Sequence, residues 1–102
     1  MVPKIKINGK TYIATAPKAK IWREIVKFDE NRTQENTVDF IDKHAEMIAK
    51  VFDNSEVTAE SVLDNLGLDE IVPKYFEVFK WICELINSKL QQLPNESTPT
   101  AE

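Results

Sequence analysis

The segment from Leu68 to Pro94, LDEIVPKYFEVFKWICELINSKLQQLP, constrains the fold of this chain more than any other stretch. Its apolar residues recur three and four positions apart, which is the spacing of one face of an α-helix. Pro73 fits the first turn of such a helix, where its missing N–H costs no hydrogen bond, and Pro94 would stop it. The spacing predicts a long helix over residues 70–93, whose apolar seam is formed by Phe76, Phe79, Cys83, Ile86, Leu90 and Leu93.

Two further helices are predicted upstream by the same periodicity. Pro17 suits a first helical turn, and Ile21, Ile25 and Phe28 follow it at helical spacing, which predicts a helix over residues 17–30. A second apolar stripe predicts a helix over residues 37–53, and its members are Val38, Ile41, Ala45, Ile48 and Phe52.

A short helix over residues 58–66 is predicted by its capping residues. Thr58 is a good N-cap, and Ser61 stands at the capping-box position three residues later. Gly67 fits the left-handed position that commonly ends a helix.

A β-hairpin over residues 4–14 is predicted near the start of the chain. Asn8-Gly9 is the preferred pair for a two-residue type I′ turn, and KIKI and KTYI flank it as short strands. Because an isolated hairpin is marginal in water, we expect it to lie against the rest of the molecule or to pair with another copy.

These elements predict a mostly α fold, in which an N-terminal β-hairpin is followed by a small bundle of three to four helices. With 102 residues the chain is sized for one domain, which we place at residues 1–93. The tail over residues 94–102, PNESTPTAE, has nothing to bury and is predicted to be disordered.

Charge and cysteine content narrow the classes of function. The 17 acidic and 13 basic residues give a net charge of −4, which disfavours binding to nucleic acid or to anionic lipid. Cys83 is the only cysteine, so an intrachain disulfide is excluded and a reducing cytoplasm is the expected setting. The first ten residues lack the apolar core of a signal peptide, and no membrane helix is expected.

The sequence offers no persuasive catalytic, cofactor or metal site. His44 is the only histidine and stands among apolar residues, where a packing role is more common than a catalytic one. Cys83 lies in the apolar seam, where a thiol usually packs. Two glycines are too few for a glycine-rich phosphate loop, so we expect no enzyme, no cofactor and no metal.

A surplus of aromatic residues is the feature that favours a binding module. Two Trp, two Tyr and five Phe occur in this short chain. Aromatic side chains dominate interface energetics where part of their surface stays accessible, although each of them is individually more often a core residue. If the side chain of Trp22 is more than one third exposed, it would suit a partner surface. The candidate partner-binding residues are Trp22, Tyr75, Phe76, Phe79 and Trp81.

The order of these motifs resembles the tail assembly chaperones of long-tailed bacteriophages and of prophages in Gram-positive bacteria. The resemblance is carried by INGKTY, PKAKIWREIVKF, DFIDKHAEMIAKVF and NLGLDEIVPKYFEVFKWICELINSKLQQLP, and it covers nearly the whole chain. It implies a protein of the host cytoplasm that holds the tape measure protein soluble during tail assembly and is absent from the virion. It also implies a longer, frameshifted form whose extra domain recruits the tail tube protein.

Two other functions stay open at this level. One is a structural or adaptor protein, a homo-oligomer that assembles through the hairpin edge and the last helix. The other is an acidic inhibitor of a nucleic-acid enzyme, which would require Asp and Glu side chains clustered on one face.

Overall fold

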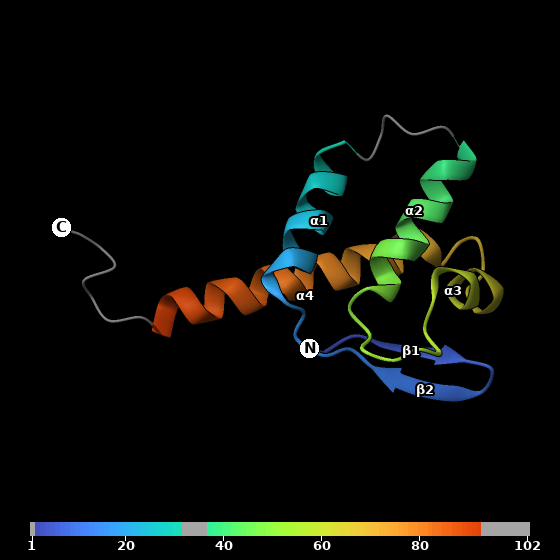
Figure 1. Ribbon diagram of the computed structural model, residues 1–102, viewed down its shortest axis with the longest axis horizontal. Helices are drawn as coiled ribbons and strands as arrows, with labels where there is room; N and C mark the ends of the chain where they lie inside the picture. Colours follow the sequence, from blue (N-terminus) through green and yellow to red (C-terminus); the bar gives the residue numbers. More distant parts are fainter. Residues whose placement is uncertain (1, 32–36, 93–102) are drawn as a thin grey trace.

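The computed structural model describes residues 2–31 and 37–92, and Figure 1 shows a β-hairpin with four helices. The elements are β1 Lys4–Ile7, β2 Lys10–Ile13, α1 Ala19–Glu30, α2 Thr37–Ala49, α3 Ala59–Asn65 and α4 Ile71–Gln92. The mostly α class and the N-terminal hairpin are therefore confirmed. Helix α4 runs along the long axis of the molecule, α1 and α2 cross it, and α3 lies near the hairpin (Figure 1). The predicted disordered tail, residues 94–102, lies outside the described residues.

The hairpin turn has the predicted geometry. Asn8 and Gly9 have φ angles of +51° and +82°, which are the left-handed values that a type I′ turn requires at both central residues. The strands pair antiparallel, with Ile7 opposite Lys10 and Ile5 opposite Tyr12. Because side chains alternate along a strand, Ile5 and Ile7 share one face, and both are buried.

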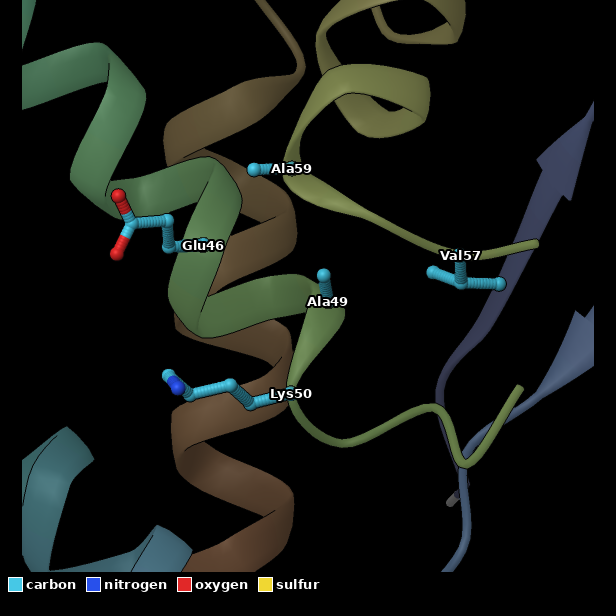
Figure 2. A pocket seen from close by; sticks show the side chains of 5 residues that line it. All are labelled: Glu46, Ala49, Lys50, Val57 and Ala59. Atoms are coloured by element: carbon cyan, nitrogen blue, oxygen red, sulfur yellow. The ribbon is translucent and has the colours of Figure 1, made fainter. Parts of the chain in front are cut away.

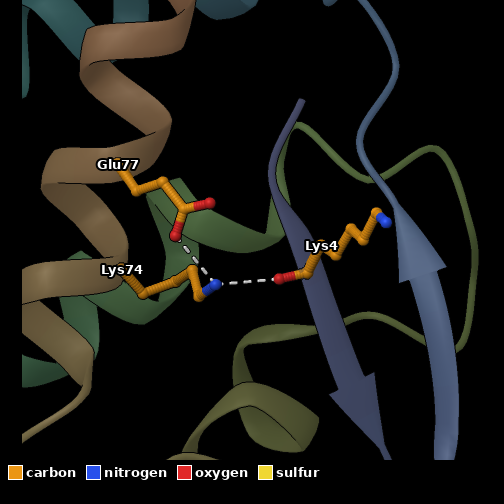
Figure 3. Close-up of polar contacts among 3 residues, drawn as sticks. All are labelled: Lys4, Lys74 and Glu77. Carbon is orange, nitrogen blue, oxygen red and sulfur yellow. Dashed lines mark hydrogen bonds and ion pairs between the residues drawn. The ribbon is translucent and has the colours of Figure 1, made fainter. Parts of the chain in front are cut away.

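The hairpin lies against the helices, and its apolar face packs into the hydrophobic core. The backbone N–H of Asn8 donates to Oδ1 of Asn65 in α3 at 2.9 Å. Lys74 of α4 donates from Nζ to the Lys4 carbonyl at 2.8 Å, and the same ammonium pairs with Glu77 at 2.9 Å (Figure 3). Side chains from two helices thus hold the hairpin at its turn, through Asn8, and at the start of β1, through Lys4.

Helix α3 begins with the predicted capping box. The Thr58 hydroxyl accepts a hydrogen bond from the Ser61 backbone N–H at 3.1 Å, and the Thr58 N–H donates to Oγ of Ser61 at 2.8 Å. These two bonds satisfy donors that a helix N-terminus otherwise leaves open.

Two helices differ from their approximate predicted ranges at one end each. Helix α1 begins at Ala19, because Lys18 has an extended backbone, so Pro17 precedes the helix. Helix α2 ends at Ala49 instead of residue 53. The Val51 N–H bonds to the Ile48 carbonyl, three residues back, while the Val51 carbonyl accepts from the Thr15 N–H at 3.0 Å. The chain therefore leaves the helix to join the segment that follows β2.

Gly67 does not end α3 in the predicted left-handed conformation, because its φ is not positive and the preceding Leu66 is extended. Instead, its N–H donates to Oε1 of Glu70 at 2.6 Å, and its carbonyl accepts from the Glu70 N–H at 2.8 Å. Gly67 thus opens the turn that leads into α4. A Cβ added there would meet Oδ1 of Asp69 at 2.8 Å.

One hydrophobic core joins the hairpin and all four helices. Helix α4 contributes the largest share, and its inner row is defined here as Ile71, Tyr75, Val78 and Ile82, all of which are buried. The other helices and β1 pack on it with Ile5, Ile7, Ile25, Phe28, Ala45, Ile48 and Val62. Within the described residues, no helix is long and apolar enough to cross a bilayer.

Candidate functional site

Tyr75 and Trp81, two of the five candidate partner-binding residues, are core residues in the structure. Tyr75 has no exposed surface, and Trp81 is 6% exposed. A partner cannot reach either side chain in this conformation, so the accessible aromatic surface is smaller than the sequence suggested. Sequence periodicity could not separate them from their neighbours, because apolar residues surround most of α4.

Tyr75 joins three helices at the centre of an aromatic cluster. Its ring meets Phe28 of α1 and His44 of α2 edge to face, with centroids 5.5 Å and 4.7 Å away. Its hydroxyl donates to Oδ1 of Asp29 in α1 at 2.8 Å. Edge-to-face contacts of this kind stabilise aromatic pairs beyond their buried area. The role that the contacts assign to Tyr75 is to hold α1 and α2 against α4.

His44 belongs to the same cluster and has no exposed surface. Its Nδ1 is within hydrogen-bonding distance of the Phe40 carbonyl, one turn earlier in α2, and its ring also meets Phe28 at 4.9 Å. The expected packing role of His44 agrees with this environment. Among the described residues, no group of three or more His, Cys, Asp and Glu side chains could hold a metal ion.

Phe76 and Phe79 lie outside the buried cluster but touch it. Phe76 is 44% exposed and meets the Tyr75 ring at 5.5 Å, while Phe79 is half-buried and stacks on Tyr75 at 6.0 Å. They belong to a second row on α4, which we call the outer row and which consists of Val72, Phe76, Phe79, Cys83 and Ile86. The core thus presents an aromatic layer to solvent at this place.

Trp22 lies on α1, apart from the other four candidates. Its side chain is 37% exposed, which exceeds the one third that would suit a partner surface. Ile21 and Ile25 of the same helix are half-buried and buried, so Trp22 stands on the flank of the apolar stripe. Trp22 makes no ring contact with another described residue, and the structure therefore does not join it to Phe76 and Phe79.

Sequence reasoning missed three strongly exposed apolar side chains. Ile13 on β2, Val38 at the start of α2 and Leu68 before α4 are 57%, 67% and 79% exposed. Val38 is a member of the predicted apolar stripe of its helix, but at this first turn its side chain faces solvent. Helical spacing alone cannot show that α2 projects beyond the core at its N-terminus.

Two hollows adjoin the C-terminal end of α2. The first, of about 380 Å³, separates α2 from the segment before α1 and is lined by residues that include Pro17, Ile21, Val51 and Phe52. The second, of about 270 Å³, is lined by Glu46, Ala49, Lys50, Val57 and Ala59 (Figure 2). Lys50 borders both hollows and pairs with Glu24 of α1 at 3.0 Å.

Neither hollow has the composition of a reaction site. The walls carry apolar side chains from Ala to Phe, and their charged groups are Lys, Asp and Glu, without a histidine or a cysteine. General acid–base or nucleophilic chemistry needs its groups within hydrogen-bonding reach of one another, and the one ion pair that described residues form at these walls, between Lys50 and Glu24, lies at the surface. The arrangement is suited to receive an apolar side chain beside a charged rim.

Comparison with known proteins found a matching protein family. A family model described as "Phage tail chaperone protein" matches residues 2–97, which is almost the entire chain. No match was found among curated proteins or among solved structures.

Proposed function

The chain belongs to the phage tail chaperone family, and from this premise we propose that it binds the tape measure protein and keeps it soluble until the tail tube forms around it. The role is that of a binding protein without enzymatic activity or cofactor. The observation that carries the proposal is the accessible aromatic surface, namely Trp22 on α1 and Phe76 with Phe79 on α4.

The proposed client is a long helical protein with apolar stripes. Such stripes are aggregation hazards as long as nothing covers them, because large exposed apolar patches associate with one another. A groove or row of aromatic side chains can receive an amphipathic helix through residues spaced three and four apart. Phe76 and Phe79 have that spacing and already rest on a rigid core through Tyr75.

The strength of each contact has to be modest for this role. Burying one large apolar side chain contributes about 1.5–3 kcal/mol, so two or three partly exposed aromatics give weak binding once association entropy is subtracted. Several copies along one client would together keep it covered. Arriving tube subunits could then displace the copies one at a time, which a single tight complex would prevent.

Charge supports the solubility of the complex. The chain carries a net charge of −4, and acidic surface groups keep coated assemblies apart by mutual repulsion. We place the action in the host bacterial cytoplasm, before the virion is complete. We further propose that the protein is absent from the mature virion, and that a longer frameshifted form recruits the tail tube protein.

Co-expression with the tape measure protein tests the central claim. We expect the client to move from the insoluble to the soluble fraction and to co-purify with the chaperone. If the client is equally insoluble with and without the chaperone, and no complex is recovered, the proposal is wrong. Mass spectrometry of purified virions tests the absence of the protein from the finished particle.

Matched substitutions locate the binding surface. Trp22→Asp and Phe76→Asp place a charge on the two most exposed candidate aromatics, and we expect each to reduce recovery of the complex. Leu68→Asp is the control. Leu68 is 79% exposed, lies before the start of α4 and is not one of the candidate partner-binding residues. Equal loss with all three variants would indicate a general effect of charge instead of a defined surface.

A further inference from the structure

Helix α1 carries three rows of side chains, and one of them belongs to the core. The core row is buried or half-buried and consists of Ile21, Ile25 and Phe28. The two other rows are what we call the apolar strip, formed by Ala19, Trp22 and Val26, and the basic strip, formed by Lys20, Arg23 and Lys27. Each strip has spacings of three and four residues, so its members share one side of the helix. Because the strips are offset by one residue, they run next to each other, about 100° apart.

The apolar strip is not explained by packing within the described part of the chain. Trp22 is 37% exposed, and Ala19 is also exposed. Val26 is half-buried, but unlike Phe79 and Ile86 it does not pack against the buried core of the described residues. An indole and a valine one helical turn apart therefore form a small apolar face on the outside of α1.

The basic strip is not neutralised by neighbouring carboxylates. Its three side chains are exposed, and none of them forms an ion pair with another described residue. Two acidic residues of α1 are engaged elsewhere, since Glu24 pairs with Lys50 of α2 at 3.0 Å and Asp29 accepts from the Tyr75 hydroxyl at 2.8 Å. The third, Glu30, is exposed at the last position of the helix. The strip thus presents three positive charges to solvent.

Charge is distributed unevenly along the chain. Residues 1–28 contain seven Lys and Arg and a single Glu, whereas residues 29–102 contain six Lys and Arg and 16 Asp and Glu. A chain with a net charge of −4 therefore has a basic segment, and most of α1 belongs to it. Opposite charges across an interface steer association and select the partner. The basic strip therefore points to an acidic partner.

We propose that α1 docks an acidic amphipathic helix of a partner protein across its two open strips. Apolar side chains of the partner, spaced three and four residues apart, cover Trp22 and Val26. Asp and Glu side chains next to them pair with the basic strip. Under the proposed function this helix belongs to the tape measure protein, so the identity of the partner rests on that function, while the chemistry of the docked helix does not.

A nucleic acid is also negatively charged, but the two strips fit a protein helix better. The basic strip spans only about 10 Å, which is seven residues at 1.5 Å each. A long polyanion would extend beyond it, towards a chain whose remaining residues are strongly acidic. Val26 in the apolar strip offers neither a positive charge for a phosphate nor a ring for a base.

Fluorescence anisotropy with labelled synthetic peptides tests the docking without the client. One peptide is a helix of about 21 residues, or six turns, with Leu at spacings of three and four and Glu next to each Leu. The second has Gln in place of every Glu, so it keeps the apolar spacing and loses the charge. We expect the full chain to bind the Glu peptide on the order of tenfold more tightly at low salt, because three surface ion pairs each contribute a factor of about two. Equal affinities overturn the proposal, as does a DNA duplex that displaces the Glu peptide at equal concentration.

Charge reversal shows whether the peptide binds to the basic strip. Arg23→Glu with Lys27→Glu should weaken binding of the Glu peptide on the order of tenfold and remove most of its salt dependence, since salt screens exposed charges. Lys6→Glu with Lys43→Glu is the matched control, because it changes the net charge equally at exposed positions of the hairpin and α2, and its affinity should stay near that of the wild type. Circular dichroism verifies that both variants are folded. Equal losses in the two variants would show a general effect of net charge and overturn the proposal.

Co-expression with the tape measure protein separates this inference from the proposed function. If the wild-type chain leaves the client insoluble, the proposed function is wrong, and the peptide affinities still decide whether α1 docks an acidic helix. If the wild type and Arg23→Glu with Lys27→Glu hold the client equally well, the chaperone function stands and the client does not bind through the basic strip, which overturns the inference for this partner.

Discussion

The Tyr75 hydroxyl donates a hydrogen bond of 2.8 Å to Oδ1 of Asp29, and this bond links α4 to the last turn of α1. The Tyr75 ring is buried, whereas Asp29 is half-buried, so the bond lies at the boundary between core and solvent. Together with the ring contact between Tyr75 and Phe28, it fixes the end of α1. The position of α1 in turn decides which face Trp22 presents.

Removal of this hydroxyl gives the first prediction. Tyr75→Phe keeps the ring contacts and deletes only the donor, so we expect the free energy of unfolding to fall by about 1.5 kcal/mol, the lower end of the range for a hydrogen bond to a charged group, because Asp29 is half-buried. Urea denaturation measures the loss. Tyr12→Phe is the control, because Tyr12 is half-buried on the hairpin and, within the described part of the chain, Lys10 makes the one aromatic or cation–π contact with its ring. Equal losses in both variants would contradict the importance of the Asp29 bond.

His44 gives the second prediction. His44→Ala removes a fully buried ring that contacts Phe28, Phe40 and Tyr75, and we expect a loss of about 3 kcal/mol in unfolding free energy from the cavity and the lost contacts. His44→Phe keeps a ring at the site and should lose distinctly less. Thermal unfolding measures both variants. If the two are equally unstable, the hydrogen bond at Nδ1 outweighs the packing.

The two glycines give a third prediction as a matched pair. Gly9→Ala places a side chain at φ +82° with no atom within 4 Å of the new Cβ, so its cost is purely conformational, about 1 kcal/mol. Gly67→Ala has no positive φ, and its Cβ meets only the ends of flexible Asp69 and Glu70 side chains. We expect it to lose less stability in urea denaturation than Gly9→Ala. The opposite order would show that the Gly67–Glu70 contact matters more than the turn.

Local signals in the sequence predicted local structure well. The Asn8-Gly9 pair specifies its turn through backbone conformation alone, and Thr58 with Ser61 specifies a helix start through bonds across three residues. Neither depends on distant parts of the chain. These elements could therefore be placed to within a residue or two before any packing was known.

Signals that depend on packing were ambiguous. Val51 and Phe52 are buried and continue the apolar period of α2, yet the helix has already ended, because the Val51 carbonyl pairs with Thr15 far away in the sequence. Tyr75 and Phe76 are neighbours of similar chemistry, but one is fully buried and the other is 44% exposed. Which of the two side chains is buried depends on where α1 and α2 cross α4. The periodicity of the α4 sequence contains no information about that crossing.

The two tryptophans give the last prediction, which concerns exposure directly. Trp81→Phe leaves Trp22 as the only indole, and Trp22→Phe leaves Trp81. Trp22 is 37% exposed and Trp81 is 6% exposed, so acrylamide should quench the fluorescence of the Trp81→Phe variant several times more strongly. Its emission should also lie at longer wavelength, since water surrounds more of the ring. In concentrated urea both variants should quench alike, which excludes an intrinsic difference between the two sites. Equal quenching of the folded variants would place Trp22 in the core and remove it from the proposed client surface.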